Sequence, residues 1–257
     1  MSPVTTIGLL HPGEMGGALG ARLRERGHDV LWVGEARSAA TRERADAAGL
    51  RDAGSLARLR DESELVLSVC PPHAALDVAR AMAGYAGVFA DANAIAPATV
   101  EAVRAVVEGA GGQFVDGGII GPPPEGAGTT RLYLSGAEAA RVAAAFDGTV
   151  VEAPVVGPDP GTASALKMAY AAWTKGTAAM LLAIRATARA AGVEDALVHE
   201  WRRSQPDVPG RLAAAHDAAA RKGWRWVGEM EEIAATFAAA GQPDGFHRAA
   251  AEVFRSQ

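Results

Sequence analysis

A chain of 257 residues, 49% of them hydrophobic, can form one large or two modest domains with hydrophobic cores, and this composition excludes an intrinsically disordered protein. Its 30 acidic and 25 basic residues leave a formal net charge of -5 without a long basic run, which argues against nucleic acid as a partner. The sequence lacks an apolar run of about 18 residues and the pattern of a signal peptide, so we expect a cytoplasmic protein without a membrane-spanning segment.

The first informative stretch, residues 6–20, reads as a strand, a turn and a helix. Residues 7–10 are apolar and too few for a buried helix, so they predict a strand, and the helix formers at residues 18–26 predict a helix. A second apolar run at residues 30–33 completes a strand–helix–strand unit of the length expected for a dinucleotide-binding fold.

The turn of this unit has the position of a phosphate-binding loop. Such a turn directs the free N–H groups of a helix at a pyrophosphate, and its glycines let the backbone approach the phosphates. The six positions of G-x-G-x-x-G are His11, Pro12, Gly13, Glu14, Met15 and Gly16. Because a histidine replaces the first glycine, an ordinary turn stays open as the alternative.

The motif I-G-L-L-x-P-G-E-M-G, followed by G-H-D-V at the second strand, resembles the β-hydroxyacid dehydrogenase and 6-phosphogluconate dehydrogenase superfamily. Later residues are similar to a branch with a phosphogluconate-dehydrogenase-like, NAD-binding C-terminal domain, and the resemblance spans nearly the whole chain. It implies an α/β fold: an N-terminal Rossmann-type doubly wound sheet followed by an all-helical C-terminal domain. It also implies hydride transfer between a nicotinamide and a small hydroxy or oxo compound.

The tip of the second strand is where such folds select their cofactor. A carboxylate there accepts hydrogen bonds from the ribose 2′-hydroxyl of NAD, whereas arginine suits the 2′-phosphate of NADP. Both Glu35 and Arg37 are present, and the resemblance places Arg37 and Ser38 where NADP-preferring relatives carry arginine followed by serine or threonine. We therefore predict NADP, with NAD as the less favoured cofactor and a solvated loop arginine as the alternative for Arg37.

Two further predicted strands end near the expected cofactor. Residues 64–70 form an apolar run that Pro71 and Pro72 must end, and the resemblance places Cys70 and both prolines beside the dinucleotide. A buried structural thiol is the alternative for Cys70. Asn93 follows the strand predicted at residues 88–91, where ligands bind in open α/β sheets, so it either reaches nicotinamide or substrate or forms a plain Asx turn.

Residues 113–124, QFVDGGIIGPPP, suggest the substrate site. A short strand at residues 114–115 is expected to stop at residues 116–118, and the glycines and prolines predict a rigid loop whose free N–H groups hold an anion. The superfamily carries a carboxylate-binding serine in the corresponding loop, and this sequence lacks it. We therefore expect a less polar or larger substrate than a simple hydroxyacid. The candidate substrate-binding residues are Gly117, Gly118, Ile119, Ile120 and Gly121.

The proline-rich stretch at residues 154–160 predicts the domain boundary. We expect a dinucleotide-binding domain at residues 1–158 and a helical substrate and dimerisation domain at residues 159–257. A long helix is predicted at residues 161–192, and shorter helices at residues 193–203, 212–222, 224–240 and 245–254. The apolar faces of so alanine-rich a helical domain, together with the resemblance, predict a homodimer.

The catalytic candidate is Lys167, about two turns into the long helix among apolar residues. Partial burial there disfavours the charged form of a lysine and suits it to acid/base work. The superfamily carries a lysine at this spacing from a glycine and an asparagine one turn later; here Tyr170 or Thr174 is expected to replace the asparagine. The alternative for Lys167 is a structural lysine. We expect Lys175 at the surface or an interface, and His247 in a surface or capping position.

The combined prediction is an NADP-dependent oxidoreductase with Lys167 as the acid/base group, supported by Asn93 and Tyr170. The first alternative is an imine reductase that reduces C=N bonds. The second is a sensor or scaffold that binds NADP without catalysis. No metal site is predicted, because the lone cysteine and the scattered histidines lack metal-ligand spacing.

Overall fold

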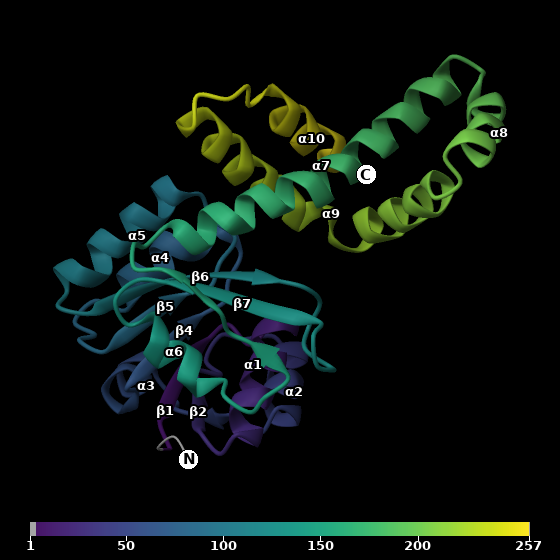
Figure 1. Ribbon diagram of the computed structural model, residues 1–257. Helices are drawn as coiled ribbons and strands as arrows, with labels where there is room; N and C mark the ends of the chain where they lie inside the picture. Colours follow the sequence, from purple (N-terminus) through teal and green to yellow (C-terminus); the bar gives the residue numbers. More distant parts are fainter. Residues whose placement is uncertain (1–3, 257) are drawn as a thin grey trace. The chain divides into compact units, whose positions relative to one another are not determined.

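The computed structural model describes residues 4–256 and falls into two compact units, which divide between Lys167 and Met168. Unit 1 is an α/β domain around one sheet, and unit 2 is built from helices (Figure 1). The predicted fold class is confirmed. The sequence places the boundary after residue 158, before the long helix, whereas the units divide inside that helix. Every helix in the described range is too short or too polar to cross a lipid bilayer.

Unit 1 contains a doubly wound sheet. Its strands are β1 (Thr6–Leu10), β2 (Asp29–Trp32), β3 (Arg51–Asp52), β4 (Leu65–Ser68), β5 (Val88–Asp91), β6 (Gln113–Ile120), β7 (Thr130–Ser135), β8 (Val151–Glu152) and β9 (Val155–Gly157). Within residues 4–256 their order is β3-β2-β1-β4-β5-β6-β7-β8, with β9 paired to β7. The first six strands are parallel, and β7 runs antiparallel to β6. The strand order reverses between β1 and β4, which is the switch point of such sheets.

Helices cover both faces of this sheet (Figure 1). They are α1 (Glu14–Glu25), α2 (Ala39–Ala47), α3 (Leu56–Glu62), α4 (Ala75–Ala81), α5 (Pro97–Gly109), α6 (Ala139–Ala145) and the short 3-10 helix η1 (Pro72–Ala74). Leu19 and Leu23 of α1 belong to one hydrophobic core together with Leu9 of β1. Leu59 of α3 and Val103 of α5 belong to a second core. The two cores arise because α1, α2 and α6 bury their apolar sides on one face, and α3, α4 and α5 on the other.

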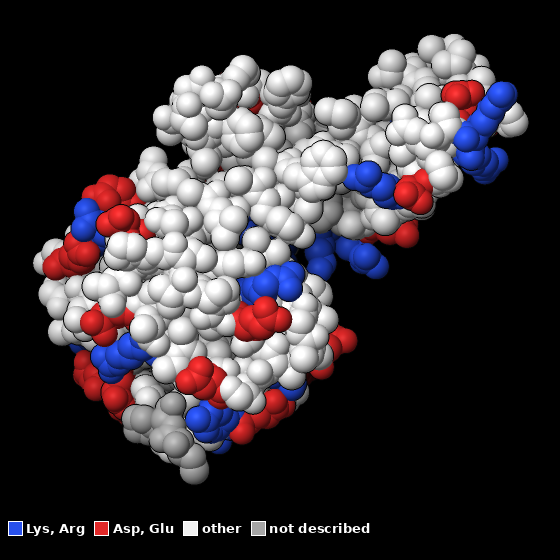
Figure 2. All heavy atoms as spheres, in the orientation of Figure 1, with Lys and Arg blue, Asp and Glu red and all other residues white. Residues whose placement is uncertain are grey.

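Charges of both signs are mixed over the surface of unit 1 in the face shown in Figure 2. Among the charged residues of unit 1, Arg51 contacts Asp29 at 2.7 Å and Glu62 at 2.9 Å. Exposed pairs of this kind stabilise a fold only slightly. In this face, then, the charged residues neutralise one another locally instead of forming a field of one sign.

The structure corrects the prediction for residues 116–121. The sequence predicts a strand that stops at residues 116–118 and then a loop, but β6 continues to Ile120 and pairs with β7. Its glycines are needed because neighbours approach closely: a Cβ at Gly117 would lie 3.0 Å from the Asp91 carbonyl oxygen, and one at Gly118 would lie 2.8 Å from that of Ala163. The predicted loop conformation is therefore wrong over residues 117–120, which form a buried strand, and their part in binding stays a prediction.

Unit 2 comprises most of α7 (Thr162–Ala190) together with α8 (Glu194–Ser204), α9 (Val208–Ala239) and α10 (Gly245–Arg255). The long helix predicted at residues 161–192 is confirmed. The break predicted at Gly223 is wrong, since α9 runs through it. Trp226 of α9 packs edge-to-face on Phe254 of α10, with ring centroids 5.0 Å apart. Packing of this kind offsets the cost of one helical glycine, about 1 kcal/mol.

Two polar side chains of unit 2 are more buried than the sequence predicts. Lys175 of α7 forms an ion pair with Glu229 of α9, and their side chains are 13% and 9% exposed. His247 of α10 is 7% exposed and packs edge-to-face on Phe237 of α9. The surface alternative is wrong for both residues, because α9 and α10 cover the faces of the helices that carry them; the interface alternative for Lys175 and the capping alternative for His247 stay predictions.

Candidate functional site

The sheet register brings the predicted site residues of unit 1 to one edge. Leu10 of β1 lies opposite Ser68 of β4, and Ser68 lies opposite Asp91 of β5. Asp91 in turn lies opposite Asp116 of β6. The turns after β1 and β4, the segment after β5 and the middle of β6 therefore gather at the carboxyl edge of the first strands, where open α/β folds bind ligands.

The two motif glycines in the turn after β1 have different tasks. A Cβ at Gly16 would lie 2.5 Å from the carbonyl oxygen of His11, so only glycine allows α1 to close against the turn. Gly13 is the N-cap residue of α1 and has no side chain with which to cap it. Apart from Gly13 and its two chain neighbours, none of the described residues has a heavy atom within 4 Å of a Cβ placed at Gly13, so the approach to this helix N-terminus is open.

His11 adopts the conformation of the glycine that it replaces. Its φ is 65°, in the left-handed region, which histidine tolerates better than bulkier residues do. Burial, together with the positive charge of Arg37, lowers the pKa of His11 to about 4. The imidazole is therefore neutral at pH 7, and the turn after β1 lies within electrostatic reach of the segment after β2 that carries Arg37.

That segment forms a basic corner beside the turn. Ser38 caps α2, because its hydroxyl accepts a hydrogen bond from the Thr41 N–H at 3.3 Å. Arg44, which the sequence reasoning missed, donates to the Thr41 hydroxyl at 3.1 Å and to the Pro12 carbonyl at 3.5 Å. The signal that could have found Arg44 is its spacing of three residues from Thr41 on a predicted helix. Two guanidinium groups, those of Arg37 and Arg44, are thus available near the turn.

Asn93 ties the ends of β4 and β5 together. Its amide oxygen accepts a hydrogen bond from the Cys70 N–H at 2.5 Å, and its amide nitrogen donates to Ser68 at 3.2 Å and to Asp91 at 2.8 Å. The side chain is 2% exposed. Asn93 therefore holds the turn that leads into Pro71 and Pro72, and both ends of its amide are engaged by neighbouring residues.

Two acidic groups at this edge have raised pKa values. Burial raises the pKa of the Cys70 thiol to about 12, and the nearby Asp91 charge adds to the shift. The thiol therefore stays protonated, which agrees with the structural alternative for Cys70. Burial raises the pKa of Asp91 to about 7; hydrogen bonds from Asn93 oppose this shift, and the Asp116 charge adds to it.

Lys167 lies against β6. A Cβ at Gly118 would come within 2.9 Å of the Lys167 Cβ and 2.8 Å of the Ala163 carbonyl oxygen, so the start of α7 packs directly on this strand. The Lys167 side chain is partly buried, as the sequence predicts. The structure thus brings Lys167 and Gly118, two residues predicted from separate motifs, together at the end of β6.

Tyr170 lies three residues after Lys167 but belongs to unit 2. Its side chain is 47% exposed. Thr174 donates to a carbonyl of its own helix, that of Tyr170 or Ala171, at 3.4 Å. The proposed replacement of the superfamily asparagine by Tyr170 or Thr174 stays a prediction.

Several solved structures and one domain model are similar to this chain. Residues 188–257 match the model of a domain of unknown function, DUF1932. A conserved protein of unknown function, whose structure reveals similarity with 3-hydroxyacid dehydrogenases, is 28% identical; the match covers 98% of this chain and 96% of that one, with a TM-score of 0.72. A 3-hydroxyisobutyrate dehydrogenase from Salmonella typhimurium is 16% identical, with coverages of 98% and 93% and a TM-score of 0.74. A reductive aminase from Aspergillus terreus, in complex with NADPH and ethyl levulinate, is 19% identical, with coverages of 99% and 93% and a TM-score of 0.62.

The chain resembles the 3-hydroxyacid dehydrogenases. The resemblance predicted from the opening motif is thereby confirmed. A 3-hydroxyacid dehydrogenase-like fold implies a nicotinamide dinucleotide, and three observations of unit 1 fit one. The helix N-terminus behind Gly13 is open. The Nδ1 of His11 and the Nε of Arg37 are buried, and the described residues offer neither of them a hydrogen-bond partner. A bound phosphate or ribose would supply such partners.

Proposed function

We propose that this protein is an NADP-dependent oxidoreductase that transfers a hydride between nicotinamide and a carbon of a small hydroxy or oxo compound. The packing of Lys167 against Gly118 supports the proposal, because Gly118 lies two residues after Asp116, which is level with the last residues of β4 and β5 at the edge of the sheet. The residues proposed to hold the dinucleotide are the turn from His11 to Gly16, Arg37, Ser38, the segment from Cys70 to Pro72, and Asn93. Arg44 joins this set as a second cation.

In this proposal, the side chains of the protein transfer the proton that accompanies hydride transfer. The nicotinamide, when bound, supplies or accepts the hydride at its C4. During reduction, the ammonium group of Lys167 donates a proton to the substrate oxygen, and during oxidation its neutral amine takes that proton back. Tyr170 is proposed to support this step. The residues from Gly117 to Gly121 are proposed to line the substrate. A less polar or larger substrate than a simple hydroxyacid is proposed because the sequence lacks the serine of the superfamily loop.

Replacement of Lys167 by alanine tests the proposal. We expect Lys167→Ala to lower turnover by about 10²-fold while NADPH still binds, because only the proton transfer is lost. The measurement is nicotinamide absorbance with a panel of oxoacids, aldehydes and cyclic imines. Lys222→Ala in α9 is the matched control. Wild-type turnover by Lys167→Ala would remove that residue from the mechanism, turnover of imines alone would favour C=N reduction, and binding without any turnover would favour a sensor.

Cofactor preference is a separate prediction. Arg37→Ala should weaken NADPH binding by about 10-fold or more and leave NADH binding nearly unchanged, because the guanidinium forms a charge-assisted hydrogen bond only with the 2′-phosphate. Isothermal titration with each nucleotide measures this. Arg58→Ala, which removes an exposed arginine of α3, is the control. Equal affinity of the wild type for both nucleotides would contradict the role of Arg37.

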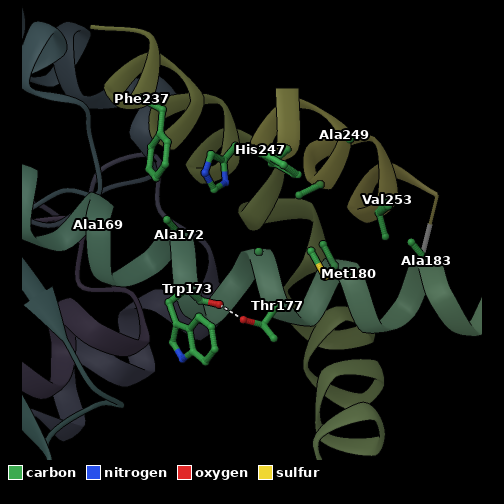
Figure 3. Close-up of a pocket in the computed structure, with 14 residues that line it drawn as sticks. Ala169, Ala172, Trp173, Thr177, Met180, Ala183, Phe237, His247, Ala249 and Val253 are labelled. Carbon is green, nitrogen blue, oxygen red and sulfur yellow. Dashed lines mark hydrogen bonds between the residues drawn. The ribbon is translucent and has the colours of Figure 1, made fainter. Parts of the chain in front are cut away.

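The predicted homodimer is also a proposal. Unit 2 contains a groove of about 560 Å³ between α7, α9 and α10, lined mainly by alanine and larger apolar residues. Figure 3 shows Ala172 of α7 below Phe237 and His247 across this groove. Trp173, Met180 and Phe246 at its walls are 65%, 54% and 70% exposed. Monomers rarely expose so many neighbouring apolar groups, so we propose that a second copy covers the groove in a two-fold arrangement.

A further inference from the structure

Asp116 of β6 carries four hydrogen bonds although it is only 1% exposed. Its Oδ2 accepts from the Gly161 N–H at 2.9 Å, from the Ser164 N–H at 3.0 Å and from the Ser135 hydroxyl at 3.0 Å. Its Oδ1 accepts from the Ser164 hydroxyl at 2.5 Å. Both oxygens of this buried carboxylate are therefore directed at the start of α7 and at β7.

These bonds replace a local helix cap. The first N–H groups of a helix lack partners within the helix, and a side chain just before the helix usually satisfies one of them. Here Asp116 satisfies the N–H groups of Gly161 and Ser164, and the hydroxyl of Ser135 accepts from the Ala163 N–H at 3.1 Å. The caps come from the sheet, so the first turn of α7 is fixed to β6 and β7 in position as well as in conformation.

The same contact determines where Lys167 lies. Residues 116 and 118 point to the same face of β6, because side chains alternate along a strand. Asp116 holds Ser164, and two residues further along the strand, the missing side chain at Gly118 makes room for Ala163 and Lys167. Ser164 and Lys167 are three residues apart, on one side of α7. β6 therefore contacts α7 at two successive positions. Asp116 anchors the helix through Ser164, and Gly118 packs against Ala163 and Lys167.

We propose that Asp116 is the positioning residue for Lys167: it anchors the first turn of α7 on β6 and so fixes the backbone from which the Lys167 side chain extends. The catalytic part of this inference rests on the proposed function. The anchoring part does not, since it concerns the apoprotein. Asp91, opposite Asp116 on β5, hydrogen-bonds to Asn93 and not to α7, so it does not share this task.

The first test measures the apoprotein. Asp116→Asn keeps one acceptor but places an amide against the N–H donors of α7. We expect hydrogen exchange of the amides at residues 161–164 to accelerate by about tenfold or more, because a hydrogen bond to a charged group is lost. Acetylation of Lys167 by acetic anhydride, followed by mass spectrometry, should also become faster, whereas Lys175 and Lys222 should react as before.

The second test measures turnover with NADPH. Because misplacement of a reacting group by about 1 Å can cost 10²-fold in rate, we expect kcat of Asp116→Asn to fall by about that factor, with an unchanged Kd for NADPH. Val103→Ala, which removes core methyl groups from the buried side of α5, is the control for a general loss of folding stability. It should lower the melting temperature without changing the acetylation of Lys167 or the Kd for NADPH. Ser164→Ala, which removes a single bond to Asp116, should show a smaller effect in the same direction and serves if Asp116→Asn fails to fold.

The outcomes separate the two proposals. The anchoring role of Asp116 would be overturned if both Asp116→Asn and Ser164→Ala left two quantities unchanged. These are the hydrogen exchange of the amides at residues 161–164 and the acetylation rate of Lys167. A fall in kcat no larger than that of Val103→Ala would overturn its link to catalysis. If the exchange and acetylation results are as expected but the wild type turns over no substrate, the proposed function fails while the anchoring inference stands.

Discussion

His11 is the residue that departs most clearly from the glycine motif. A left-handed conformation costs a residue other than glycine about 1–2 kcal/mol, and histidine is among the residues that tolerate it best. The turn is retained because the His11 carbonyl oxygen accepts a hydrogen bond from the Gly13 N–H at 2.8 Å. The same carbonyl oxygen packs closely on Gly16 of α1, which has no side chain to prevent it. The substitution therefore changes the chemistry of the loop, from a bare backbone to a neutral imidazole, and keeps its shape.

This imidazole predicts a specific pH dependence. The pKa of His11 is about 4 in the folded state and 6.5 in the unfolded state, so the unfolded chain binds more protons between these values. The stability that His11 contributes is complete above pH 6.5 and is lost as the pH falls toward 4. His11→Asn, which tolerates the left-handed conformation and does not titrate, should lose less stability on acidification.

Urea denaturation across this pH range measures the difference between the two proteins. His199→Asn, at an exposed position of α8, is the control for the loss of any one histidine. The same slope of unfolding free energy against pH in the wild type and His11→Asn would contradict the buried, neutral state of His11.

At the scale of elements, the contact between β6 and α7 depends on the absence of a side chain at Gly118. Gly118→Ala would place a methyl group 2.8 Å from the Ala163 carbonyl oxygen, so α7 or β6 must move. We expect a loss of about 1–3 kcal/mol in the free energy of unfolding, as for other overpacked sites. The fall in kcat should be larger than the fraction of unfolded protein accounts for, because Lys167 moves with α7. Urea denaturation and kcat measure the two effects.

Gly126, in the loop between β6 and β7, provides the matched control. Apart from Gly126 and its two chain neighbours, none of the described residues has a heavy atom within 4 Å of a Cβ placed there. Gly126→Ala should therefore leave stability and turnover almost unchanged, or raise stability slightly by restricting the unfolded chain. If Gly118→Ala behaves like Gly126→Ala, the close contact between β6 and α7 is wrong.

For the whole molecule, the apolar groove of unit 2 predicts self-association. Trp173→Glu keeps a helix former in α7 but puts a charge at the wall of the groove, and burial of an unpaired charge is costly. We expect this variant to sediment as a monomer at concentrations at which the wild type is a dimer. Trp224→Glu in α9 is a closely matched control, because Trp224 is 68% exposed, against 65% for Trp173, and lies outside the groove lining. A monomeric wild type, or equal effects of both variants, would contradict the proposal.

The sequence alone determined the elements whose signals are local. Apolar runs, breakers and helix formers act over a few residues, so the strands at residues 7–10, 30–33, 64–70 and 88–91, the turn from His11 to Gly16 and the long helix around Lys167 could be predicted. The resemblance carried by the opening motif also follows from the order of residues, because a phosphate-binding turn needs its glycines at fixed spacing.

Only the tertiary structure decided which glycines end an element and which polar residues are buried. Gly117 and Gly118 look like strand breakers in sequence, yet they extend β6 because β5 and α7 press against it. Asp116 and Arg44 gained their partners, and Lys175 its ion pair, from segments distant in sequence. Such roles depend on which surfaces meet in space, and the free energy of that packing outweighs the local preferences that a sequence pattern records.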